Sequence, residues 1–188
     1  NSSACTTGTE AIALAFERIK AGKAKRMLAG STSDGGPYVW AGFDAMRILP
    51  HAYNENPIKA SQPLSANASG FVPGCGAGAL VLESLESAES RGATVYAEVI
   101  GSAINSGGQR NWAKALEREG SDFPLINSLK GMTGHCLSAG GSIEAVATVL
   151  QLHEQFLFPN VNCDTIHPHI LKLIDVQCIP RKQKNVAL

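Results

Sequence analysis

The chain has 188 residues, of which 44% are hydrophobic, enough to build a core in one large domain or two small ones. Sixteen basic residues balance sixteen acidic ones, so no overall field attracts nucleic acid or an anionic membrane surface. No apolar run reaches transmembrane length and no signal peptide is visible. We therefore expect neither nucleic acid nor a membrane among its partners.

The five cysteines, at positions 5, 75, 136, 163 and 178, are odd in number and show no paired spacing. This pattern indicates reduced thiols in a cytoplasmic protein rather than a disulfide framework. No Cys/His cluster has the spacing of zinc ligands, so we expect no metal, and no cofactor is predicted either.

The first predicted element is a helix of about five turns that begins near Cys5, because apolar residues recur at helical spacing from Ala11 to Ile19. A thiol at a helix N-terminus faces unpaired backbone N–H groups and the positive end of the helix dipole, which favour the nucleophilic thiolate. Cys5 is therefore a candidate nucleophile. The octapeptide 1–8 fits equally well an inert, buried cysteine in a turn of small residues.

Three further segments follow in the first part of the chain. Residues 26–30 predict a short buried strand, and a helix is predicted at 41–48, ended by Pro50. The stretch 50–70 is rich in Pro, Asn and Ser, which is typical of an irregular surface excursion.

The alternation of strands and helices continues beyond this excursion. A buried strand is predicted at 78–83, a short helix at 84–90 closed by Gly92, and a long strand at 95–104. Such alternation indicates a layered α/β domain.

A histidine in a Gly-rich turn is the second candidate for chemistry. His135 follows a strand predicted at 125–128 and precedes a helix whose apolar face begins with Ile143. A lone histidine is more often structural than catalytic. Lys130, five residues earlier, and the glycines of the turn favour the catalytic interpretation here. The turns at Cys5 and His135 each lead into a helix, which suggests two matching halves of one fold.

Four motifs, in this order along the chain, resemble the β-ketoacyl-acyl-carrier-protein synthases, the condensing enzymes of fatty-acid synthesis. They are 4–8 (Ala-Cys-Thr-Thr-Gly), 42–46 (Gly-Phe-Asp-Ala-Met), 70–78 (Gly-Phe-Val-Pro with Gly-Ala-Gly) and 130–135 (Lys…Gly-His). The resemblance is to the elongating type I and II branch. It implies an α/β fold of the thiolase-like, layered αβαβα type with mixed sheets, of which this chain covers only a part.

The resemblance also implies a division of the chain and a role for five residues. Residues 1–92 would be the remainder of the N-terminal half, with the nucleophile, and 93–188 the C-terminal half. Cys5 matches the nucleophile that accepts the acyl group as a thioester. The other matches are His135, which stabilises the malonyl enolate, Lys130, which tunes His135, Glu144 in the polar network, and Phe43 in the acyl-chain pocket.

Ordinary alternatives exist for three of these residues. Lys130 could be a solvated loop charge, Glu144 a plain exposed helix residue, and Phe43 a core residue. The implied partners are acyl- and malonyl-loaded acyl carrier protein and a second copy of the chain in a homodimer.

The chain departs from the family pattern in several places. The first active-site histidine, in a His-Gly-Thr loop, has no counterpart, and none of the other four histidines (51, 153, 167 and 169) replaces it by motif. Only nineteen residues separate Arg110 from Lys130, which predicts a missing segment near 110–112. The resemblance implies a further portion before Cys5 and a C-terminal oxyanion loop, which this sequence does not include. Gln62 stands where the family has arginine, and Ser138 where it has a turn glycine.

The function implied is acyl transfer to Cys5, followed by decarboxylative Claisen condensation with malonyl-carrier protein in fatty-acid elongation. One alternative is a non-catalytic partner similar to a chain-length factor, although such partners usually lose the cysteine. A polyketide-type ketosynthase is a second alternative. A thiolase or starter-type synthase is a third, but neither Cys163 nor Cys178 lies in the Cys-x-Gly turn that thiolases need.

Overall fold

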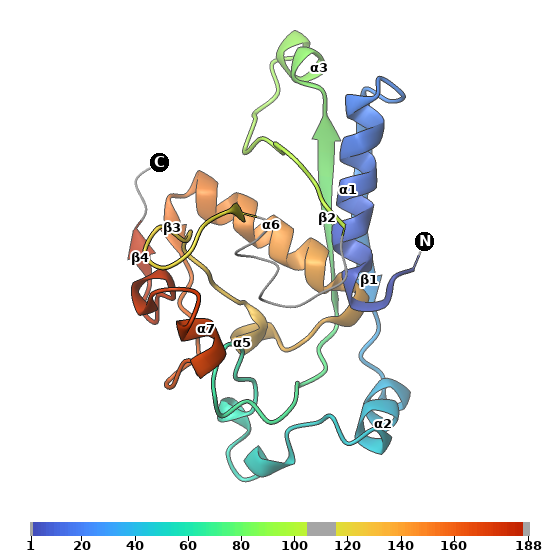
Figure 1. Cartoon of the computed structure of the whole chain (residues 1–188). Helices are drawn as coiled ribbons and strands as arrows, with labels where there is room; N and C mark the ends of the chain where they lie inside the picture. Colours follow the sequence, from blue (N-terminus) through green and yellow to red (C-terminus); the bar gives the residue numbers. More distant parts are fainter. Residues whose placement is uncertain (1, 105–115, 186–188) are drawn as a thin grey trace.

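The computed structural model describes residues 2–104 and 116–185 (Figure 1). Its helices and strands are α1 (Thr7–Lys20), β1 (Arg26–Ser33), α2 (Pro37–Ala45), β2 (Gly76–Glu83), α3 (Leu85–Ser90), α5 (Lys130–Thr133), α6 (Gly140–His153), β3 (Phe156–Leu157), α7 (Pro168–Leu171) and β4 (Lys184–Asn185). Single 3-10 turns connect them: η1 (Ala4–Thr6), η2 (His51–Tyr53), η3 (Pro57–Lys59), η4 (Leu137–Ala139) and η5 (Val176–Cys178).

The centre of the molecule is an antiparallel ribbon of β1 and β2, paired from Arg26↔Glu83 to Ser33↔Gly76. Helix α1 lies along one face of the ribbon, and α6 packs against both β2 and α1 (Figure 1). Alternate side chains of a strand point to opposite faces, so Ala29 and Leu82 are buried with Ala15 of α1. On the other face the cross-strand partners Leu28 and Val81 remain 74% and 66% exposed.

A second hydrophobic core lies in the C-terminal part of the chain. Its buried members are Phe123, Cys163, Ile166, Ile170, Ile174, Cys178 and Ile179. Backbone hydrogen bonds connect this part to the irregular excursion before β2, for example from the N–H of Ala66 to the carbonyl of Thr165 at 2.7 Å. The excursion is therefore attached to the C-terminal core rather than to the ribbon.

Most predicted elements are confirmed. The helix at the start of the chain, the strand at 26–30, the irregular stretch 50–70, the strand at 78–83 and the helix after His135 are all present, β1 being three residues longer than expected. Helix α3 begins after Ser84, whose side chain accepts a hydrogen bond from Ser87 N–H, and it is followed by Gly92 at φ 65°.

The helix predicted at 41–48 begins earlier and ends earlier. Pro37 occupies its first turn, where a fixed φ and a missing N–H are tolerated. The helix stops at Ala45 because Arg47 lies in the left-handed region, at φ 57°, and not because of Pro50.

The long strand predicted at 95–104 is wrong. No strand pairs with this segment in the described part of the chain, and Ile100 is 89% exposed. A strand is stabilised by its neighbours' hydrogen bonds and side chains, so alternating apolar residues without such a neighbour do not form one.

The strand predicted at 125–128 is also wrong, because its backbone bonds to the side chain of Asn160 and to the carbonyl of Cys178 and forms no strand ladder. Asn160 accepts from the N–H of Ser128 at 2.9 Å and donates to the carbonyl of Ile126 at 2.9 Å. The N–H of Ile126 donates to the carbonyl of Cys178 at 2.8 Å. These hydrogen bonds thus hold the segment without making it part of a sheet.

Other predictions concern the whole chain. The missing segment expected near 110–112 lies outside the described residues. All five cysteines are free in the structure. Within 2–104 and 116–185, no helix has the length and apolar character needed to span a membrane, and no cluster of three or more metal-ligating side chains occurs.

Candidate functional site

Cys5 lies in the 3-10 turn η1, directly before α1, and it is exposed. The turn is sharp because Ala4 has φ 52°, a conformation uncommon for a residue with a Cβ. Thr7 holds it closed: its hydroxyl donates to the carbonyl of Ala4 at 2.7 Å and accepts from the N–H of Ser3 at 3.0 Å. The thiol is thereby presented at the start of a 14-residue helix, as the sequence predicted.

The starts of α1 and α6 approach each other very closely. A Cβ on Gly141 would lie 2.1 Å from Oγ1 of Thr9, and a Cβ on Gly8 would lie 2.5 Å from the backbone nitrogen of Ser142. Because of this approach, the turn η1 contacts both η4 and α6. The turn with Cys5 and the turn after His135, far apart in sequence, therefore lie side by side.

His135 is fixed by a short parallel pairing with the Gly-rich motif before β2. Its N–H donates to the carbonyl of Val72 at 2.7 Å, and its carbonyl accepts from the N–H of Gly74 at 3.0 Å. The preceding residue must be glycine: Gly134 has φ 68°, and a Cβ there would lie 2.7 Å from the carbonyl oxygen of Val72. Two motifs quoted for the family resemblance thus meet at this histidine.

The half-buried imidazole of His135 has a defined tautomer. Its Nδ1 accepts a hydrogen bond from the N–H of Leu137 at 3.2 Å, so the proton of the neutral ring resides on Nε2. Burial lowers the pKa of His135, the positive charge of Lys130 lowers it further, and Glu144 partly opposes them. The ring is therefore held neutral near pH 7, with Nε2–H available as a donor.

Lys130 and Glu144 form an ion pair, and both charges act on the imidazole of His135. Lys130 belongs to the short helix α5 and Glu144 to α6, and both side chains are about one-third exposed. The hydroxyl of Ser61 donates to the carbonyl of Lys130 and so attaches α5 to the excursion before β2.

Phe43 reaches the histidine through a second aromatic ring. The centroids of Phe43 and Phe71 lie 5.0 Å apart in an edge-on arrangement, and those of Phe71 and His135 lie 4.9 Å apart. Phe71 was quoted as part of a motif but not predicted as a site residue. Only the pairing of residues 72–74 with His135 brings it to the imidazole, and nothing local in the sequence signals that pairing.

The predicted residues thus lie in one region of the structure, but they do not all contact one another. Lys130, Glu144 and Phe43 connect to His135 directly or through one neighbour, whereas Cys5 joins them by the contact between η1 and η4. Among the described residues, the thiol of Cys5 makes no hydrogen bond with His135. The remaining histidines lie elsewhere: His51 contacts Asp44, His153 stacks on Tyr96, and His167 and His169 stack on each other.

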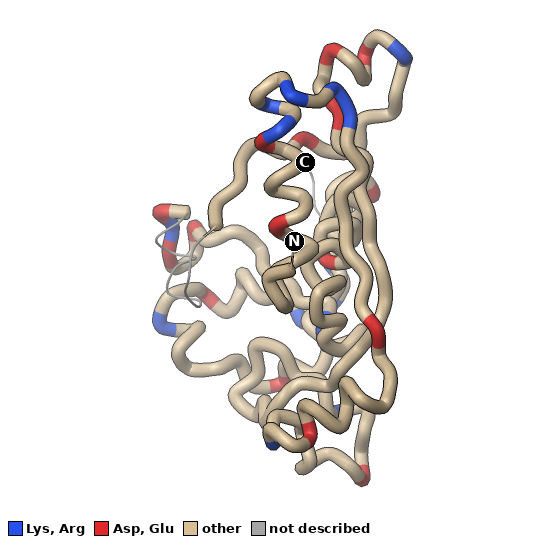
Figure 2. Tube along the Cα trace, turned by 90° about the vertical axis from the view of Figure 1, so that its right-hand side faces the viewer, with Lys and Arg blue, Asp and Glu red and all other residues tan. Residues whose placement is uncertain are grey.

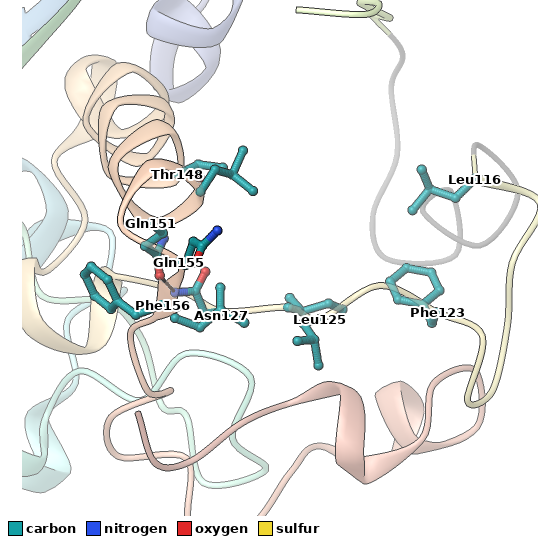
Figure 3. Close-up of a pocket in the computed structure, with 11 residues that line it drawn as sticks. Leu116, Phe123, Leu125, Asn127, Thr148, Gln151, Gln155 and Phe156 are labelled. Carbon is teal, nitrogen blue, oxygen red and sulfur yellow. Dashed lines mark hydrogen bonds between the residues drawn. The ribbon is translucent and has the colours of Figure 1, made fainter. Parts of the chain in front are cut away.

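A separate apolar pocket of about 520 Å³ lies between the end of α6 and the segment around Phe123 (Figure 3). Its walls include Leu125, Leu152 and Phe156, and Asn127 donates to Gln151 at 2.7 Å across one side. None of the described residues that line this pocket has a titratable side chain.

Comparison with known proteins defines the family. The model of the Beta-ketoacyl synthase, N-terminal domain, matches residues 1–88, and that of the Beta-ketoacyl synthase, C-terminal domain, matches residues 112–164. The 3-oxoacyl-[acyl-carrier-protein] synthase 2 of Vibrio harveyi is 33% identical over 236 residues, covering 100% of this chain and 56% of that protein. The protein of the same name from Rhizobium meliloti (strain 1021) is 35% identical over 234 residues, with coverages of 98% and 55%.

The chain therefore belongs to the β-ketoacyl synthase family, and it spans about half the length of the curated relatives it matches. The alignment with the Vibrio harveyi protein extends over 236 residues although this chain has 188, so the relative carries segments without a counterpart here.

Solved structures agree with this assignment. The ketosynthase of a type II polyketide synthase, solved in complex with its acyl-carrier protein, has a TM-score of 0.85 and 29% identity, and covers 99% of this chain and 56% of that one. A β-ketoacyl synthase from Burkholderia phymatum STM815 has a TM-score of 0.80 and 27% identity, with coverages of 98% and 55%. The structure is part of a thiolase-like fold, and the predicted fold class is confirmed.

Proposed function

We propose that this protein is a β-ketoacyl-acyl-carrier-protein synthase that elongates fatty acids. The thiolate of Cys5 attacks an acyl-carrier thioester, and the carrier thiol leaves. In the second half-reaction, the bond between the methylene and the carboxylate of malonyl-carrier protein breaks. Its electron pair moves into the thioester as an enolate while CO₂ departs. The enolate carbon then attacks the acyl group on Cys5, and the thiolate is released.

The tautomer of His135 is the observation that carries this proposal. An enolate oxygen needs a neutral donor already aimed at it, and the Leu137 N–H on Nδ1 leaves Nε2–H for that task. The lowered pKa of His135 keeps the donor uncharged near pH 7. In this scheme Lys130 and Glu144 set the local field around His135, and Phe43 lines the acyl-chain pocket.

The proposal includes partners and a location. Acyl carrier protein would deliver both substrates, which the solved complex of a related ketosynthase with its acyl-carrier protein supports. We also propose a homodimer located in the cytoplasm. Residues 1–92 would belong to the N-terminal half of the fold and 93–188 to the C-terminal half, with a segment of the family missing near 110–112.

Two half-reactions measured separately test the proposal. Purified protein is incubated with acyl-carrier protein loaded with a medium-chain acyl group, and the acylated peptide is identified by mass spectrometry. Release of labelled CO₂ from malonyl-carrier protein is measured in parallel. We expect His135→Ala to abolish CO₂ release while acylation at Cys5 continues, and Cys5→Ser to abolish acylation. Loss of acylation in His135→Ala with unchanged CO₂ release would give His135 a different role.

One observation favours a second candidate, a non-catalytic partner similar to a chain-length factor. In the described parts of the chain, His135 is the only histidine near the turn with Cys5, whereas the family pattern has two. A polyketide-type ketosynthase remains the alternative within catalysis. Absence of both acylation and CO₂ release, with restored activity when an active synthase is added, would favour the non-catalytic partner. Acylation by polyketide intermediates only would favour the polyketide-type enzyme.

A further inference from the structure

The end of strand β1 carries hydroxyl side chains that reach the turn after His135. Ser33 donates to the carbonyl of Cys136 at 2.7 Å, and Ser31 donates to the carbonyl of Ser138 at 2.8 Å. In return, the hydroxyl of Ser138 donates to the carbonyl of Thr32 at 2.7 Å. Ser31 and Ser33 share one face of the strand because side chains alternate, so both can bond to the same turn.

The turn that these serines hold has a constrained backbone. Leu137 has φ 46°, in the left-handed region that residues with a Cβ seldom occupy. The two carbonyls bound by Ser33 and Ser31 belong to the residues on either side of Leu137. Backbone conformations of this kind persist where the surroundings fix them, and here hydrogen bonds on both flanks do so.

The conformation of Leu137 has a consequence for His135. The N–H of Leu137 is the donor to Nδ1, at 3.2 Å, and rotating the turn would aim this N–H elsewhere. Without that donor, Nδ1 becomes free to carry the proton of the neutral ring, and Nε2 would then be an acceptor. The carbonyl that Ser33 binds and the N–H that donates to His135 belong to the same peptide unit, the one between Cys136 and Leu137. The hydrogen bond from β1 therefore acts on the tautomer of His135 through this peptide unit.

A further serine near Ser31, Ser142 of α6, is fully buried. Because Ser31 donates its proton to Ser138, the hydroxyl of Ser142 donates to that of Ser31 at 2.8 Å, and the carbonyl of Ala139 lies 3.0 Å from it. Ser142 has no exposed surface, so its hydrogen bonds are shielded from competing water.

We propose that Ser31, Ser33 and Ser138, the serine clasp, are positioning residues that hold His135 in the tautomer with a proton on Nε2. The proposal rests on the function proposed above, in which that proton stabilises the enolate. The hydrogen bonds that join these serines and the turn end on backbone carbonyl oxygens, so the serines act through the backbone of the turn.

The tautomer can be measured directly on the whole chain. Protein labelled with ¹⁵N-histidine is studied by long-range proton–nitrogen correlation at neutral pH, with the His135 signals assigned by comparison with His135→Ala. We expect an unprotonated Nδ1 and a protonated Nε2 in the parent protein. The double variant Ser31→Ala/Ser33→Ala should show a mixture of tautomers, and Ser33→Thr, which keeps the hydroxyl, should resemble the parent. Ser102→Ala removes a remote exposed hydroxyl that donates to Glu17 and should change nothing.

The second readout is turnover. Release of CO₂ from malonyl-carrier protein should fall about 10- to 100-fold in kcat with little change in KM in the double variant. If the double variant does not fold, Ser138→Ala supplies the same test with one hydroxyl removed.

An unchanged tautomer in a folded clasp variant would overturn the proposal, even if His135→Ala still abolishes CO₂ release. A shifted tautomer supports it, even if His135 proves not to act in decarboxylation. The two proposals therefore fail separately.

Discussion

Two charges of opposite sign act on the imidazole of His135 from the ion pair beside it. Lys130 lowers the pKa of His135 and Glu144 raises it, while burial contributes the largest lowering. The pKa of His135 is lower in the folded state than the value of about 6.5 in the unfolded state. As the pH falls below that value, the folded state therefore binds fewer protons than the unfolded state. Protonation of His135 therefore opposes folding on the acid side, and its neutral form is retained near neutral pH.

Removing either charge should move this titration in a predictable direction. Lys130→Gln removes a cation and leaves Glu144 unpaired, so the pKa of His135 should rise. Glu144→Gln leaves Lys130 unpaired, so the pKa should fall. Proton NMR titration of His135 measures both. Shifts of the same sign in the two variants would show that desolvation, not the ion pair, controls the difference.

The five free thiols should differ widely in reactivity. Cys5 is exposed at the start of α1, whereas burial raises the pKa values of Cys136, Cys163 and Cys178. If Cys5 is the nucleophile proposed above, a limiting amount of iodoacetamide should label Cys5 first and the buried three last. Peptide mass spectrometry over time gives the order. Cys75 is the internal control, since it is also exposed, and equal rates for Cys5 and Cys75 would contradict an activated Cys5.

At the scale of elements, the contact between α1 and α6 leaves no room for a side chain. In Gly141→Ala the new methyl group would meet Thr9, and relieving the overlap must separate the helices. We expect a loss of about 1–3 kcal/mol in the free energy of unfolding, measured by urea denaturation. Gly42→Ala in α2 is the matched control, because nothing lies within 4 Å of its new Cβ and the change should be neutral or stabilising by up to about 1 kcal/mol. Equal effects in the two variants would mean that the close approach is not maintained in solution.

At the end of the ribbon where β1 begins and β2 ends, the carboxylate of Glu83 forms several interactions. Glu83 accepts hydrogen bonds from Arg91 and Ser87 and forms an ion pair with Arg26. These interactions lower the pKa of Glu83 to about 2. Figure 2 shows both signs of charge at the end of the molecule that carries α3.

This depressed pKa predicts a pH dependence of stability. A carboxylate with a folded pKa of about 2 stabilises the fold above its unfolded value of 4.5, and the contribution disappears as the pH falls toward 2. Denaturant melts of the parent should weaken across this window, and those of Glu83→Gln should vary less. Glu55→Gln, which changes a carboxylate for which the structure gives no ion pair, is the control. Parallel curves for parent and Glu83→Gln would contradict the linkage.

The elements that were predicted well are those in which the spacing of apolar residues within the element itself indicates a helix or a strand. Helices α1 and α6 and strand β2 each bury one face against a near neighbour, so their spacing survives in the structure. The segments 95–104 and 125–128 carry strand-like residues but no strand partner, and partners are a tertiary property. The site shows the same division: Cys5 and His135 were visible as motifs, whereas Phe71 and the serine clasp depend on contacts across more than sixty residues.

At the scale of the whole molecule, two hydrophobic cores share the stability. One lies between α1 and the ribbon, and the other lies in the C-terminal part around Ile170. The candidate site lies along the connections between these parts: η1 belongs to the first, and α5 is attached through Ser61 to the excursion that pairs with the second.

The uncovered face of the ribbon has a consequence for colloidal behaviour. Leu28 and Val81 form a cross-strand apolar pair open to water, and such surfaces attract one another when no charge keeps molecules apart. The formal net charge is zero at pH 7 and the isoelectric point is about 7.1, so mutual repulsion is weakest at neutral pH. Light scattering should show the strongest self-association of this chain near pH 7 and less at pH 9. Leu28→Lys, which adds a charge on that face, should reduce it, making pH and this one position the practical controls on solubility.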